Sequence, residues 1–156
     1  MRPQALLFKA LNPVMAALLQ SPLHGIASAN ICILTYRGRR SGRTISTPLS
    51  FMREGTLVRL LSTHNTRWWK NFLFEEEHEA GDVEIEIARR TYHGKARTFA
   101  DDGERYREGI RRFLTAVPRD AGVNRIRLDA DRKPREEDIA KAAGHVVLVE
   151  VQLDDV

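Results

Sequence analysis

The chain of 156 residues has the length of one domain and an ordinary globular composition, with 42% hydrophobic and 29% charged residues. This composition argues against a wholly disordered chain, and no apolar stretch of 18 residues is present to cross a bilayer. Cys32 is the single cysteine, which excludes an internal disulfide framework and a multi-cysteine metal site. The length predicts one domain over residues 1–156. No signal peptide is visible and a single cysteine suits a reducing compartment, so the sequence predicts a cytoplasmic protein.

The net charge of +4 is unevenly distributed along the chain. Residues 1–75 carry ten Lys or Arg and two acidic residues, a balance of +8, whereas residues 76–156 carry fifteen and nineteen, a balance of −4. Four arginines fall within seven residues: Arg37, Arg39, Arg40 and Arg43. Such a cluster attracts phosphate, nucleic acid, anionic lipid or a polyanionic small ligand, and the alternative is a solvated loop without a ligand.

Residues 1–25 are expected to form a helical segment, because apolar residues between positions 5 and 19 recur at helical spacing. Asn12-Pro13 divides the segment into a short helix and a second helix over about 13–20, since Asn caps helices and Pro suits the first helical position. We expect the apolar stripe to pack on the core. The alternative is peripheral contact with a membrane surface through its basic and leucine side chains.

From residue 31 the pattern changes to β-rich runs over 31–36, 44–52 and 56–62, separated by glycine-containing turns. This predicts an antiparallel meander, in which Pro48 requires a position without a ladder hydrogen bond. A helix is expected over 65–74. Its adjacent tryptophans, Trp68 and Trp69, would point about 100° apart, so that one is core while the other faces a site, unless both are core.

The second half of the chain adds three more strands. Alternation of apolar and charged residues predicts strands over 83–87 and 91–99, and the apolar run 145–153 predicts a last strand. Helices are expected over 101–117 and 135–143, the latter within a charged connecting segment, 118–143, that either caps a pocket or mediates pairing. Six strands without a βαβ rhythm predict an α+β, mainly β fold: a small, mostly antiparallel barrel with flanking helices.

The sequence contains no familiar catalytic or metal-binding motif. Its histidines lack metal-ligand spacing, and GxSxG, Walker and dinucleotide-binding motifs are absent, so we predict no metal site. The arginine-rich turn is the remaining candidate: two glycines let backbone amides approach an anion, and Ser41 adds a hydroxyl. Trp68-Trp69-Lys70-Asn71 adds aromatic faces, a cation and an amide, a combination that suits a planar anionic ligand better than a nucleic acid.

The segment from Leu34 to Gly42, followed by Pro48-Leu49, resembles the deazaflavin-dependent oxidoreductases, also called the deazaflavin-dependent nitroreductase family. That family has a threonine-rich strand, then Gly-Arg-Lys/Arg-Ser-Gly, a short strand and Pro-Leu. A strand-end serine and a Trp-x-x-Asn helix follow, which match Ser62 and the segment Trp68 to Asn71. The order of these features agrees over roughly residues 5–100.

The resemblance implies a split β-barrel of the FMN-binding-like kind that binds coenzyme F-420, an 8-hydroxy-5-deazaflavin with a phosphate and a γ-linked oligoglutamate tail. Such a polyanion complements the +8 half of the chain. The residues expected to line the cofactor site by this resemblance are Arg39, Arg40, Ser41, Gly42, Pro48, Leu49, Ser62, Thr63, Trp68 and Asn71. We expect Arg43 and Lys70 to add contacts to the phosphate and tail.

Three positions depart from the family pattern. Ile45 stands where an arginine is common, and the glycine pair expected after Ser62 is absent. The Asn-Pro expected after the tryptophan helix is replaced by Phe74-Glu75-Glu76-Glu77-His78-Glu79. For catalysis we expect Ser62, His64 or Tyr106 to polarise or protonate the acceptor. His64 would do so as a neutral imidazole before a helix N-terminus, and the alternative for it is an exposed loop residue.

The sequence therefore predicts an oxidoreductase that uses reduced F-420 as hydride donor to an electron-poor acceptor such as a quinone or a nitro compound. The alternative is a non-catalytic split barrel that binds FMN, a tetrapyrrole such as haem, or a fatty acid. Nucleic-acid binding is the least favoured reading. Related split barrels occur as monomers and as homodimers, and the sequence does not choose between them.

Overall fold

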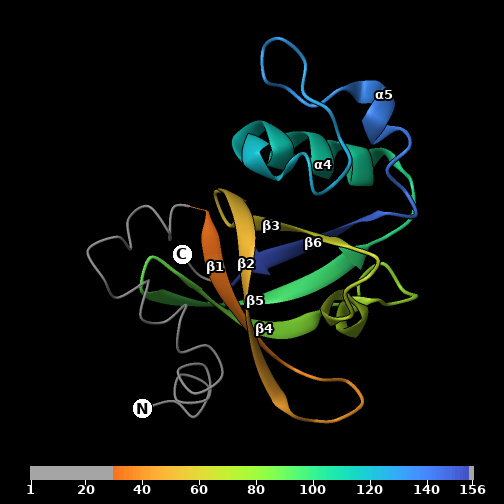
Figure 1. Cartoon of the computed structure of the whole chain (residues 1–156). Coiled ribbons are helices and arrows are strands. Elements are labelled where there is room, and N and C mark those ends of the chain that lie inside the picture. The colour runs from red at the N-terminus through yellow and green to blue at the C-terminus, as the bar shows by residue number, and fades with distance from the viewer. Residues whose placement is uncertain (1–29, 155–156) are drawn as a thin grey trace.

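The computed structural model describes residues 30–154, so the predicted helical segment over 1–25 lies outside the described residues. The strands are β1 (Ile31–Arg37), β2 (Thr44–Glu54), β3 (Leu57–Thr63), β4 (Gly81–Ile87), β5 (Arg90–Phe99) and β6 (Val146–Leu153). They close into an antiparallel barrel in the order β1-β2-β3-β6-β5-β4 (Figure 1). This architecture confirms the predicted mainly β, α+β barrel and its initial meander.

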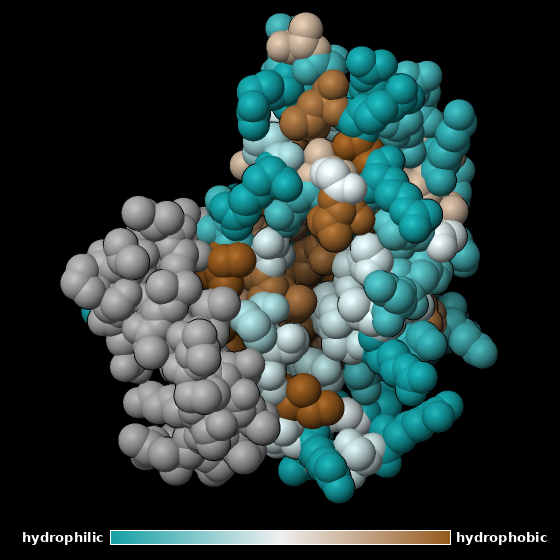
Figure 2. Space-filling view, in the orientation of Figure 1, coloured by the Kyte–Doolittle hydropathy of each residue, from teal (hydrophilic) through white to brown (hydrophobic). Residues whose placement is uncertain are grey.

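The barrel is filled by alternate residues of every strand. Strand β6 shows why its sequence is almost continuously apolar: Val147, Val149 and Val151 belong to the barrel interior, while Val146 and Leu148 face the opposite side. A strand buried on both faces loses the alternation that marks a half-exposed strand. Figure 2 shows brown, apolar residues flanked by teal, polar ones, both over the helices and down the centre of the barrel face.

Helix α4 (Glu104–Ala116) covers the outer face of β6. It forms a second core with Met52, Val146 and Leu148 through its buried side chains. These side chains are Tyr106, Ile110, Phe113 and Leu114. The helix approaches the sheet closely at Gly109, where a Cβ atom would lie 2.4 Å from Leu148 Cδ2. Glycine at this position therefore permits the packing distance between helix and sheet.

Two predicted helices are much shorter than expected. The helix predicted over 65–74 is a 3-10 helix, η1 (Trp68–Phe72), because tertiary hydrogen bonds such as Thr98 Oγ1 to Trp69 O (2.7 Å) fix its position on the barrel. The helix predicted over 135–143 is α5 (Glu136–Ile139), followed by turns that end at Gly144 with φ +99°. Another 3-10 helix, η2 (Pro118–Asp120), follows α4.

Strands β2 and β3 separate toward one end of the barrel. Only four residue pairs join them, between Phe51–Glu54 and Leu57–Leu60. The earlier residues of β2 pair with β1 and the later residues of β3 pair with β6, with no ladder pair between these two stretches in the described chain. Pro48 lies in the separated part of β2, as predicted for a residue without a backbone N–H.

Candidate functional site

Strand direction gathers most of the sequence-predicted site residues at one end of the barrel. Strand β1 runs toward the turn 38–43, β2 runs away from it, and β3 returns toward it, so Ser62 and Thr63 lie at the same end as the arginines. Helix η1 follows β3 directly and packs against β5 and β6. In Figure 1 the turn is the long orange loop and η1 is the short yellow-green helix.

The turn between β1 and β2 is built by its own backbone. The Gly38 N–H donates to Arg43 O (2.8 Å), and the Gly42 N–H donates to Gly38 O (3.0 Å). Gly42 adopts φ +68°, in the left-handed region that glycine occupies without strain. Ser41 Oγ accepts from the Arg43 N–H (3.1 Å), so this hydroxyl shapes the turn.

The three arginines of this turn differ in their surroundings. Arg40 and Arg43 are exposed, and neither forms an ion pair with another described residue. The Arg39 guanidinium instead donates to Leu73 O (2.5 Å) and lies 5.0 Å from the centroid of the Phe74 ring. Arg39 therefore fixes the turn to the segment after η1, whereas Arg40 and Arg43 are available to an anion.

A chain of hydrogen bonds connects the turn, η1 and the end of β3. The Arg39 N–H donates to Asn71 Oδ1 (2.9 Å), and Asn71 Nδ2 donates to Trp68 O (2.8 Å). Trp68 Nε1 then donates to Ser62 Oγ (3.0 Å). Asn71 thus orders both the arginine turn and the tryptophan helix, and Ser62 orients the Trp68 indole.

The hydroxyl hydrogen of Ser62 is committed within this network. Thr66 Oγ1 donates to Thr63 O (2.9 Å), so in the 2.5 Å contact between Ser62 Oγ and Thr66 Oγ1 the serine is the donor. Thr63 Oγ1 in turn donates to Asn65 Oδ1. Ser62 is therefore placed to position Trp68 and to accept one further hydrogen bond, and not to protonate an acceptor. The sequence does not predict the role of Thr66, because a threonine in a polar link has no pattern that distinguishes a structural hydrogen bond.

The two tryptophans have different exposures, and Trp69 is the core residue of the pair. Trp69 is 4% exposed and donates from Nε1 to Thr63 O (3.2 Å), while Trp68 is half-buried. Lys70 is exposed, with Nζ 5.6 Å from the Trp69 ring centroid. Leu49, in the separated part of β2, is half-buried against the same apolar core as Trp68, and Pro48 beside it is also half-buried. Apolar and polar groups therefore meet at this end of the barrel.

His64 lies at the edge of the same region. It is exposed, its N–H donates to His145 O (3.0 Å), and its ring makes an edge contact with Trp69 at a centroid distance of 5.3 Å. The helix expected to start beside it begins only at Trp68 and is a 3-10 helix of 5 residues, so the expected α-helix N-terminus is not next to the imidazole. His64 and Lys70 therefore both lie against the Trp69 ring.

Tyr106 lies apart from these residues. It is on α4, 1% exposed, and its hydroxyl donates to Val146 O (2.8 Å). Burial raises the pKa of the Tyr106 phenol well above its ordinary value. The structure therefore gives Tyr106 a packing role between helix and barrel, and does not bring it to the other candidate residues.

Tyr106→Phe is expected to lower the free energy of unfolding by about 1–2 kcal/mol, because the buried Val146 carbonyl loses its donor. Turnover should stay at the wild-type level. Urea denaturation and a steady-state assay measure both quantities. A large loss of turnover without a loss of stability would show that Tyr106 takes part in catalysis.

The donor set fits an elongated anion with a planar, partly apolar head. Exposed arginine guanidinium groups match phosphate and carboxylate oxygens, and the half-buried Trp68 and Leu49, which pack against the same core, offer apolar surface. Within residues 30–154, no group of three or more His, Cys, Asp or Glu is placed to hold a metal ion. No helix in this part of the chain is long and apolar enough to cross a membrane.

Comparison with known families agrees with this chemistry. Residues 19–126 match the family described as F-420H(2)-dependent quinone reductase. The chain belongs to this family. Membership makes it an F-420-dependent oxidoreductase with coenzyme F-420 as its cofactor, as the sequence predicted. No curated protein sequence matches the chain significantly.

Solved structures with low sequence identity are similar to this quinone reductase family member. One is described as a domain-swapped dimer (14% identity, TM-score 0.52, covering 93% of this chain and 96% of that chain). Another is Campylobacter jejuni ChuZ (14% identity, TM-score 0.51, covering 99% and 63%). A third is an F-420-H2 dependent reductase (14% identity, TM-score 0.46, covering 81% and 95%).

Proposed function

We propose that the exposed arginines Arg40 and Arg43 bind the phosphate and the first part of the tail of coenzyme F-420, and that the acceptor is a quinone. The observation that carries this proposal is a pair of exposed arginines that have no carboxylate partner among residues 30–154. Their turn is joined through the Arg39 backbone and Asn71 to Trp68 and Ser62. Trp68, Pro48 and Leu49 supply apolar surface for the deazaflavin ring, with Ser62 and Thr63 at its polar edge. Ser41 and Gly42 shape the turn that carries the arginines.

When bound, the reduced cofactor supplies a hydride, and reduction of a quinone to a hydroquinone then needs one proton at an oxygen. We assign this proton to the His64 imidazole, because the hydroxyl hydrogen of Ser62 is already donated to Thr66 and Tyr106 is buried elsewhere. The edge contact with Trp69 holds the imidazole beside that indole. The protein thus binds, orients and protonates, and no side-chain nucleophile is required.

Fluorescence titration of the full chain with F-420 at low salt, followed by turnover with a quinone and with a nitro compound of matched reduction potential, tests the proposal. We expect saturable binding and faster turnover of the quinone. Absence of a fluorescence change would overturn the assignment of the cofactor to these residues. Faster reduction of the nitro compound would make that compound class the acceptor.

Pairing of two barrels and peripheral membrane contact through residues 1–25 stay predictions from the sequence.

His64→Ala is expected to lower quinone turnover at least tenfold, since loss of a general acid typically costs more than this. The dissociation constant for F-420 should stay within about a factor of three, roughly 0.7 kcal/mol, because the imidazole is not assigned to cofactor binding. His93→Ala is the matched control, as it removes another exposed imidazole, on β5. Unchanged turnover in His64→Ala would make His64 a spectator.

A further inference from the structure

An acidic segment borders the arginine turn. It comprises residues 75–79, between η1 and β4, and four of its five residues are glutamates: Glu75, Glu76, Glu77 and Glu79. All four are exposed, and none forms an ion pair with another residue of the described chain. The four carboxylates therefore outnumber the two guanidinium groups beside the segment, those of Arg39 and Arg97, and leave it net negative.

The backbone of the acidic segment is fixed by one arginine of β5. Arg97 donates to Glu76 O (2.6 Å) and Glu79 O (2.8 Å) through one nitrogen, and to Phe74 O (3.3 Å) through the other. Because the guanidinium binds carbonyl oxygens, it leaves the side-chain carboxylates free. The segment is thus held in place by its main chain.

Two of these carboxylates share a surface depression with the arginine turn. Arg39, Leu73, Phe74, Glu75 and Glu79 line it. The Arg39 guanidinium is already bound to Leu73 O and lies over Phe74, so it offers an incoming anion less than Arg40 or Arg43 does. An anionic group that extends from Arg40 and Arg43 past Arg39 therefore meets Glu75 and Glu79, and Arg39 is the one cation among the described residues that line this depression.

We propose that the acidic segment limits the tail length of the cofactor that this protein binds well. The inference rests on the proposed function. The phosphate and first glutamates of the tail gain attraction from Arg40 and Arg43, whereas each later glutamate brings its charge toward Glu75 and Glu79. Repulsion between like charges offsets the gain from further contacts. Glutamates beyond the first part of the tail then add little or no affinity.

Binding of three ligands to the full chain tests this inference: the deazaflavin riboside without phosphate and tail, F-420 with two glutamates, and F-420 with six. In the wild type we expect the six-glutamate form to bind no more than twofold tighter than the two-glutamate form. In Glu75→Gln/Glu79→Gln we expect it to bind at least tenfold tighter, with riboside affinity unchanged. Glutamine keeps the oxygen with which Glu79 accepts from the Glu76 N–H (3.3 Å).

Glu77→Gln is the matched control, because Glu77 belongs to the same segment and does not line the depression. It should keep the wild-type ratio of affinities. A double variant with the wild-type ratio would overturn the inference, and so would a Glu77→Gln protein that behaves like the double variant. If none of the three deazaflavins binds the wild type, the proposed function fails instead, which separates the two failures.

Discussion

Simultaneous replacement of Arg40 and Arg43 by alanine is expected to raise the dissociation constant for F-420 about a hundredfold. Hydrogen bonds to charged groups contribute roughly 1.5–3 kcal/mol each, and exposed contacts lie at the low end of this range, so two of them amount to about 3 kcal/mol. Neither arginine forms an ion pair within residues 30–154, so the fold itself should lose little stability. Fluorescence titration measures the affinity, and thermal unfolding checks the fold.

Arg89→Ala/Arg90→Ala is the matched control for net charge. These exposed arginines lie at the end of β4 and the start of β5, and the pairing of β1 with β4 places them at the opposite end of the barrel from the arginine turn. The control should bind F-420 nearly as well as the wild type. Its affinity should also keep the wild-type dependence on salt, whereas that of Arg40→Ala/Arg43→Ala should depend less on salt. If both double variants lost the same affinity for F-420, overall charge and not the position of Arg40 and Arg43 would determine binding.

The strands could be predicted from the sequence because alternation and apolar runs report burial directly. Val83 and Ile85 alternate with Glu84 because one face of β4 packs on the core. The run of β6 is apolar because core lies on both of its faces. Helix η1 could not be predicted to its true length. Its extent depends on partners such as Thr98, which lies 29 residues from Trp69 in the sequence. Local propensity does not contain such contacts.

The same limit applies to the site. The sequence shows which arginines and aromatic residues are present, and the match to a family pattern indicates which cofactor they serve. It treats Arg39 and Arg40 as equivalent, however, since both are arginines in one turn. Only the contact of Arg39 with Leu73 O, 34 residues away, separates an arginine that holds the fold from one that can bind an anion. The same applies to Tyr106, whose burial depends on its packing against Val146.

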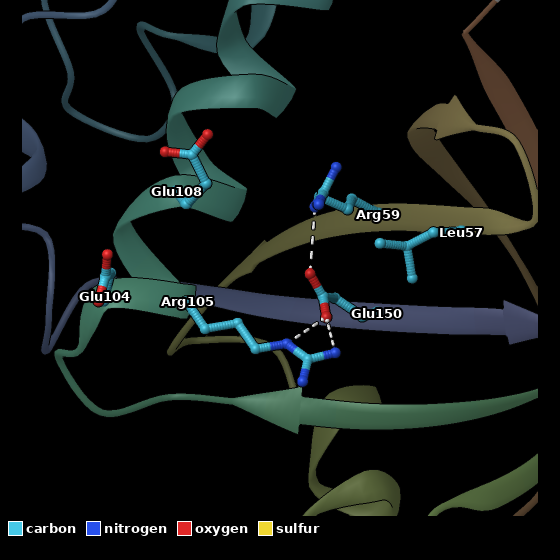
Figure 3. A pocket seen from close by; sticks show the side chains of 6 residues that line it. All are labelled: Leu57, Arg59, Glu104, Arg105, Glu108 and Glu150. Carbon is cyan, nitrogen blue, oxygen red and sulfur yellow. Dashed lines mark hydrogen bonds and ion pairs between the residues drawn. The ribbon is translucent and has the colours of Figure 1, made fainter.

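One residue of β6 departs from its apolar surroundings. Glu150 is 4% exposed, and its carboxylate accepts from Arg59 Nε (3.1 Å) on β3 and from Arg105 Nε (2.8 Å) on α4 (Figure 3). Arg59 also pairs with Glu54, which pairs with Arg112 of α4. An acidic residue between apolar neighbours in a strand is a sequence signal for such a partner. The network joins α4 to the barrel.

Glu150→Ala is expected to lower the free energy of unfolding by about 3 kcal/mol. Removal of one partner from a buried ion pair typically costs 3–5 kcal/mol, because the remaining charge stays buried, and Arg59 keeps Glu54 as a partner, which favours the low end. For a chain of this length the midpoint of thermal unfolding should fall by roughly 6–12 °C. Urea denaturation with and without F-420 measures the loss.

Asp82→Ala is the control, because it removes a carboxylate whose side chain is 87% exposed and whose pair with Lys95 lies on the surface. Exposed pairs contribute little, so the stability of this variant should stay near that of the wild type. A loss in Glu150→Ala no larger than in Asp82→Ala would show that Glu150 is effectively solvated. In that case the second core around α4, with Tyr106 and Phe113, would hold the helix on the barrel without help from the ion pairs.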